Sequence, residues 1–122
     1  MLLADFYTRV AQRLGVLPVA GTLSADDADV IRDSYVGLMH ELIEHGLGWW
    51  NADEDVPDQY AEVMIGMTAA ATVDEFTIPE PRRSQLLVQH GFGLPQASVS
   101  ERRLRALAQT PYNGDVATAE YF

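Results

Sequence analysis

Cysteine and lysine are both absent from this chain of 122 residues. Without cysteine there is no disulfide framework, no thiol nucleophile and no zinc–thiolate site, and this absence suits a reducing compartment without requiring one. The chain also lacks any run of eighteen apolar residues, and its N-terminal sequence, MLLADFYTRV, has no basic region ahead of a long apolar stretch. We therefore expect neither a membrane-spanning helix nor a secretory signal peptide.

Positive charge is scarce and unevenly placed. Eight arginines oppose eighteen carboxylates, which gives a formal charge of -10. Residues 1–75 hold fourteen acidic side chains and three arginines, whereas residues 76–122 hold four and five. The acidic front repels phosphate, so we do not expect a protein that reads DNA sequence. The arginines of the second part form two clusters, which can meet phosphate or an acidic protein surface, or can pair with the acidic half: Arg82 and Arg83, and Arg102, Arg103 and Arg105.

The clearest helical signal runs from Ser24 to Trp50. Ser24 suits a helix N-cap, and Asp27 completes a capping-box-like pair three residues later. Gly46 is a natural residue at which such a helix ends. The helix would have about twenty residues and run roughly 30 Å, so we expect it to be the central element against which the others pack. Its apolar stripe is predicted to be Ile31, Tyr35, Leu38, Met39, Leu42 and Ile43.

Four further segments show helical spacing, and little of the chain alternates with the period of a β-strand. The sequence therefore predicts an all-α fold, a small bundle of four to five helices over residues 1–109. Residues 110–122 show neither period and are predicted to form an extended tail. The four further helices are expected over Leu2–Leu14, from Pro57 to residues 74–76, from Glu80 to His90, and from a second capping box, Ser98 with Glu101.

The string HELIEH at residues 40–45 is close to the helical zinc-protease motif but does not match it. His40 and His45 are five residues apart and point about 140° away from each other on a helix, whereas the motif needs two histidines four apart. Surface pairing along the helix accounts for these side chains. We therefore predict no metal site and no cofactor.

Three acidic residues follow the two tryptophans, Trp49 and Trp50. Aromatic platforms bind sugars and paired carboxylates hydrolyse glycosidic bonds, so Asp53, Glu54 and Asp55 faintly suggest a carbohydrate site. The alternative is that one tryptophan closes the bundle and the acidic run is a solvated turn. No phosphate-binding glycine loop or nucleophilic triad is present, and we do not expect an enzyme.

Taken over most of its length, the chain resembles the small head-to-tail adaptor proteins of tailed bacteriophages, also called head completion or tail accessory proteins. The resemblance rests on a first helix ending in LG, the loop and cap VAGTLSADDADVI, and a long helix running into GLGWW. An acidic loop ending at Pro57, a small-residue helix EVMIGMTAAA and a polar tail closing on AEYF complete it.

The resemblance implies a helical bundle whose copies form a ring, usually dodecameric, beneath the portal protein at the vertex through which DNA leaves the virion. It also implies that the C-terminal segment reaches along the portal as an anchor, while DNA passes without sequence-specific binding and a tail-side connector protein binds below. Carried onto this chain, the portal-binding segment has these residues: Thr110, Pro111, Tyr112, Val116, Tyr121 and Phe122. The surface for neighbouring copies or for the tail would include Trp49, Trp50, Arg82, Arg83, Arg102 and Arg103.

Two other functions stay open on the sequence alone. One is a cell-wall glycosidase carried in the particle, which would use the carboxylates beside the tryptophans. The other is an acidic protein that mimics DNA and so occupies a nucleic-acid-binding partner, and it follows from charge alone.

Overall fold

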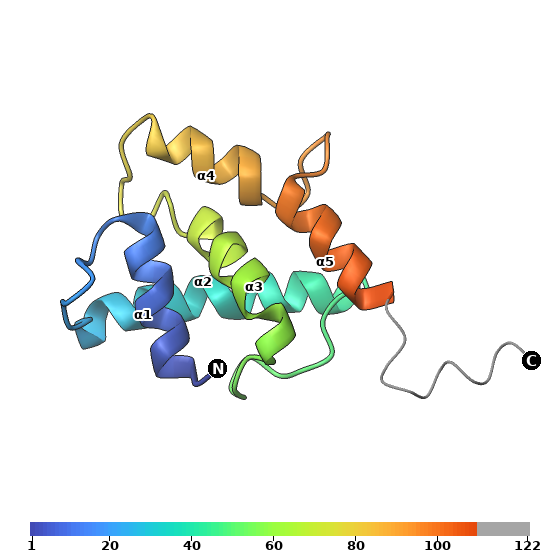
Figure 1. Cartoon of the computed structure of the whole chain (residues 1–122), viewed down its shortest axis with the longest axis horizontal. Helices are drawn as coiled ribbons and strands as arrows, with labels where there is room; N and C mark the ends of the chain where they lie inside the picture. The colour runs from blue at the N-terminus through green and yellow to red at the C-terminus, as the bar shows by residue number, and fades with distance from the viewer. Residues whose placement is uncertain (110–122) are drawn as a thin grey trace, which may run out of the picture.

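The computed structural model describes residues 1–109, which fold into five α-helices with no strand, so the all-α prediction is confirmed. The predicted tail, residues 110–122, lies outside the described residues. The helices are α1 (Leu3–Leu14), α2 (Ala25–Glu44), α3 (Asp58–Ala71), α4 (Arg82–His90) and α5 (Val99–Gln109) (Figure 1).

Local sequence chemistry sets several helix ends as predicted. Ser24 Oγ accepts a hydrogen bond from the amide of Asp27 at 3.1 Å, and Ser98 Oγ accepts one from the amide of Glu101 at the same distance. At the other end of α1, Gly15 adopts a φ of 84°, and its amide donates to the carbonyls of Ala11 and Gln12. Glycine takes this left-handed conformation without a Cβ clash, which is why α1 ends there.

The central helix is α3, and the expectation that α2 holds this place was wrong. Helix α3 packs against each of the other four helices, and ten of its fourteen residues are buried. Only five of the twenty residues of α2 are buried, because its outer face is charged. Small residues allow neighbouring helices to approach α3 from every side: Ala61, Gly66, Ala69 and Ala70. Figure 1 shows α1 and α3 side by side across α2, with α4 and α5 against the remaining faces of α3.

The sequence predicted the number of helices more accurately than it predicted where each helix begins and ends. Pro57 is the N-cap of α3 rather than its first residue, and α3 ends at Ala71, before the predicted residues 74–76. The chain turns immediately after α3, where Thr72 Oγ1 donates a 2.6 Å hydrogen bond back to the carbonyl of Thr68. Helix α4 then begins at Arg82, two residues later than expected.

An aromatic cluster closes the core between α1, α2, α3 and the loop after α2. Trp50 Nε1 donates a 2.8 Å hydrogen bond to the Tyr35 hydroxyl, and both side chains are buried. The ring of Tyr35 lies 4.8 Å from that of Phe6, and the ring of Trp50 lies 4.8 Å from that of Tyr60. Burial raises the pKa of Tyr35 to about 12, so its hydroxyl stays protonated at neutral pH. The cluster therefore joins elements that are distant in sequence.

Replacing Gly66 with alanine is expected to destabilise the protein by about 1–3 kcal/mol, the usual effect of overpacking. A Cβ at this position would lie 2.4 Å from Nδ1 of His90, so the His90 ring would have to move from its hydrogen bond with Ser100, or α4 would have to move with it. Gly37 provides the matched control, because it lies within α2 and a Cβ there would meet nothing within 4 Å. Gly37→Ala should stabilise by about 0.5–1 kcal/mol. Urea unfolding of both variants measures the two changes, and a shift of the same sign in both would contradict the packing of α4 on α3.

Candidate interaction surface

Trp49 and Trp50 have opposite environments. Trp50 is 2% exposed and belongs to the core, whereas Trp49 is 64% exposed. Their rings meet edge to face with centroids 5.7 Å apart, so the buried tryptophan supports the exposed one. Ile43, at the end of α2, adds a second exposed apolar side chain. Of the two tryptophans, only Trp49 is available to a partner, and Trp50 is a core residue rather than a surface one.

The three carboxylates of the acidic loop after the tryptophans have different surroundings. The Glu54 carboxylate accepts a hydrogen bond from the amide of Asn51 at 3.0 Å, which stabilises the turn. Asp53 lines a hollow of about 560 Å³ between α1, α2 and the loop, and Arg32 and His40 line the same hollow. Asp55 is exposed to solvent. Glu54 therefore has a structural role, and Asp53 lines its hollow together with Arg32 and His40.

The histidines of α2 do not converge. His45 Nδ1 shares a 3.0 Å hydrogen bond with the carbonyl of Glu41, and the His45 ring lies edge-on to Phe92. His40 borders the hollow on another side of the helix. Within residues 1–109, no group of three or more potential ligands among His, Cys, Asp and Glu could hold a metal ion.

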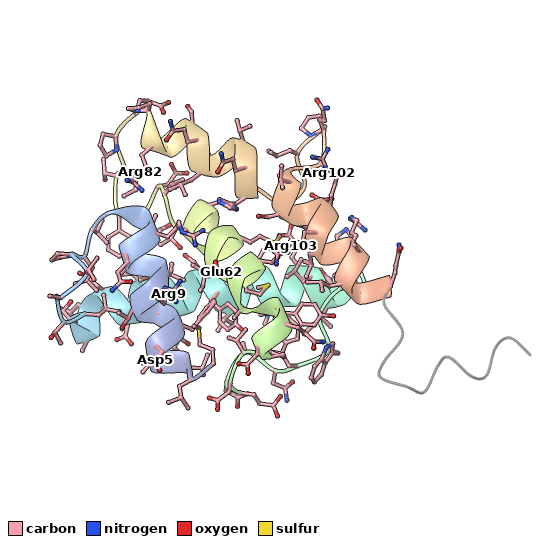
Figure 2. The ribbon with its side chains drawn as sticks, in the orientation of Figure 1. Asp5, Arg9, Glu62, Arg82, Arg102 and Arg103 are labelled. Carbon is pink, nitrogen blue, oxygen red and sulfur yellow. The ribbon has the colours of Figure 1, made fainter. Side chains whose placement is uncertain are left out.

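The arginine clusters are only partly neutralised. Arg83 pairs with Asp74 at 2.6 Å, as the ion-pairing interpretation predicted, and Arg82 donates a 2.8 Å hydrogen bond to the carbonyl of Arg13. Arg102 and Arg103 are exposed and form no ion pair with any of the residues that the structure describes. Both project from α5 (Figure 2). They give this helix an unpaired cationic surface on an otherwise acidic molecule.

Sequence reasoning missed an apolar groove beside these arginines. Val88 of α4 and Val99 of α5 are 68% and 60% exposed, and Leu94 of the connecting loop is also exposed. Together with Pro95 and Arg102 they line a groove of about 520 Å³, which we call the α4–α5 groove. The sequence gives a signal for the exposure of each valine, because both fall outside the apolar stripe of their helix, but it gives none for their meeting in one groove.

Buried polar contacts hold the walls of the α4–α5 groove. The Glu101 side chain is buried at the start of α5, where it accepts a 3.0 Å hydrogen bond from the amide of Gly93 and pairs with Arg105 at 3.1 Å. His90, at the end of α4, shares a 2.5 Å hydrogen bond with Ser100 Oγ. The loop between α4 and α5 is therefore fixed at both ends.

Stability should depend on pH through His90. Burial, with a smaller contribution from the charge of Arg13, lowers the pKa of His90 below its ordinary value of 6.5. The unfolded chain therefore binds a proton more readily than the folded chain does, so stability falls as the pH drops from about 6.5 through the folded-state pKa. Urea unfolding at pH 7.5 and pH 5.5 should show a larger loss in the wild type than in His90→Gln. Equal losses in the two proteins would contradict this account.

Comparison of the chain with protein-family models, curated proteins and solved structures gave no significant match. None of the five helices in residues 1–109 has the length and apolar character needed to cross a membrane. The residues expected to bind the portal, Thr110 to Phe122, lie outside the described part of the chain. A function therefore has to be proposed from the surface of the bundle and from the family resemblance.

Proposed function

We propose that this protein is a structural head-to-tail adaptor of a tailed bacteriophage, which assembles as a ring beneath the portal and joins it to the tail. The observation that carries the proposal is the exposure of Trp49 on a rigid support. Exposed tryptophans that pack against an ordered core are typical of protein interfaces, where they contribute much of the binding energy. Trp49 meets this description, since its ring packs edge to face against the ring of Trp50. The hydrogen bond from Trp50 to the Tyr35 hydroxyl holds Trp50 in the core.

The charges of the bundle support assembly of copies in a ring. The outer face of α2 is acidic, with these exposed carboxylates: Asp26, Asp29, Asp33, Glu41 and Glu44. Arg102 and Arg103, which form no ion pair within residues 1–109, lie on a different helix, α5. A contact between two unlike surfaces is heterologous, and a heterologous contact generates a ring when its rotation closes. One copy can therefore present its arginines to the acidic face of the next.

Acidic surface also suits a channel through which DNA passes. Where it is not paired with a neighbour, the α2 face repels the phosphate backbone and so shortens the time that DNA stays bound. In this proposal residues 110–122 bind the portal, whereas Trp49 and the arginines of α5 contact neighbouring copies or the tail-side protein. The protein would then be located at the portal vertex of the virion.

Replacing Trp49 with alanine tests the proposal. We expect ring assembly on the portal to weaken about 30-fold, which corresponds to roughly 2 kcal/mol for an interface tryptophan. Val19→Ala is the control, because Val19 is 88% exposed but lies in the loop after α1. Native mass spectrometry of each variant mixed with the portal measures occupancy against concentration. Wild-type assembly by the Trp49 variant would show that this side chain lies outside the contact between copies in the ring.

A further inference from the structure

Three exposed apolar side chains gather around the α4–α5 groove. Val88 and Val99 lie on its two helical walls and Leu94 on its loop, all three exposed. Glu101 and the His90–Ser100 hydrogen bond hold these walls in place. Large exposed side chains clustered around a hollow mark a binding site more often than single scattered ones do. The groove is therefore a candidate docking site with a fixed shape.

One segment of the same chain has the composition to fill it. Residues 110–122 read TPYNGDVATAEYF and contain four large apolar or aromatic side chains: Tyr112, Val116, Tyr121 and Phe122. The charged side chains of this segment, Asp115 and Glu120, are both acidic. The groove has the complementary character, since it offers apolar walls together with Arg102, which forms no ion pair within residues 1–109. Arg103 lies next to it in sequence on α5. Both hydrophobic burial and charge therefore favour the pairing.

The chain is long enough for this contact to form within one molecule. Helix α5 ends at Gln109, and the groove lies at its start, about 15 Å back along the helix at 1.5 Å per residue. The thirteen residues that follow span at most about 45 Å when extended, so they reach the groove with length to spare. A short tether also gives an effective concentration in the millimolar range, which favours contact within the chain over contact between chains at micromolar concentration.

We propose that residues 110–122 fold back into the α4–α5 groove of their own chain when no partner is bound. The proposal rests on the adaptor function in one respect, because the segment that fills the groove is the same segment that is proposed to bind the portal. The folded-back state covers the apolar side chains of both the segment and the groove. The portal then competes with the groove for the segment, so the anchor is released only where a portal is present.

Paired cysteines test the contact in the full-length chain, which has none of its own. The test pair is Val99→Cys with Ala119→Cys, and the control pair is Val19→Cys with Ala119→Cys. Val19 is also an exposed valine, and it belongs to the loop after α1. Figure 1 shows this loop at the far side of the bundle from α5. At low micromolar protein under mild oxidation, the test pair should form an intramolecular disulfide at least tenfold faster than the control. Equal rates, or disulfide-linked dimers, would overturn the proposal.

A second measurement does not depend on the register of the segment. In the wild type, NMR should show amide protons of residues 110–122 that are protected from exchange and shifted from random-coil values. Val99→Asp should abolish both effects while leaving helicity unchanged, since Val99 is exposed, and Val19→Asp should leave both in place. Random-coil shifts in the wild type would overturn the proposal. These experiments contain no portal, so their failure is distinct from a failure of the adaptor function, which the Trp49 variant tests.

Discussion

Trp50→Ala is expected to lower the free energy of unfolding by about 3–5 kcal/mol, a large part of the stability of a domain of this size. The substitution removes a buried indole that packs against Tyr60, and it leaves a cavity beside α2 and α3. It also removes the hydrogen-bond donor of the Tyr35 hydroxyl. Urea unfolding followed by circular dichroism measures the change.

The adjacent residue is the control for this prediction. Trp49→Ala changes the same side-chain type one position away, but Trp49 is 64% exposed, so its effect should stay within about 0.5 kcal/mol. The pair of variants separates the structural tryptophan from the interface tryptophan. Equal destabilisation by the two substitutions would mean that the assignment of core and surface between them is wrong.

Deletion of residues 110–122 is expected to weaken portal binding at least a thousandfold while helicity is retained. Two aromatic anchors at roughly 2 kcal/mol each account for a factor of that size. We expect helicity to be retained because residues of the five helices and their loops already form a hydrophobic core with one another. Surface plasmon resonance against immobilised portal gives the affinity, and circular dichroism gives the helicity.

A matched pair of full-length variants makes the deletion specific. One variant replaces the aromatic residues of the segment with alanine, Tyr112, Tyr121 and Phe122, and the other replaces Thr110, Asn113 and Thr118. The aromatic variant should bind as weakly as the deletion, whereas the polar variant should bind like the wild type. Unchanged binding after deletion would remove the anchoring role altogether.

The sequence predicted what depends on local chemistry. Ser24, Ser98 and Gly15 act within a few residues of themselves, so their places at helix ends could be read from spacing and side-chain type. The position of α3 could not be read in this way. The greater length of α2 led to the prediction that α2 is the central helix. Which helix is central depends instead on how closely the neighbouring helices can approach it. That distance is set by small residues, such as Gly66 where it meets His90 of α4.

The candidate interaction surface was predicted only in part, because its residues also depend on contacts between distant parts of the chain. Trp49 and Trp50 are adjacent in sequence, so their spacing does not show which of them is buried. Trp50 is the buried one because it contacts the Tyr35 hydroxyl of α2 and the Tyr60 ring of α3. Arg83 likewise finds Asp74 across a turn, whereas Arg102 and Arg103 stay unpaired within residues 1–109. The groove between α4 and α5 needs two helices and a loop brought together, so no single stretch of sequence reveals it.

The most direct test of the adaptor function is the native mass of the full-length chain alone and after mixing with the portal protein from the same source. The proposal predicts a monomer or small oligomer alone, and a complex in which many copies join the portal as a ring. A portal that stays intact but binds no copy of this chain would contradict the proposal.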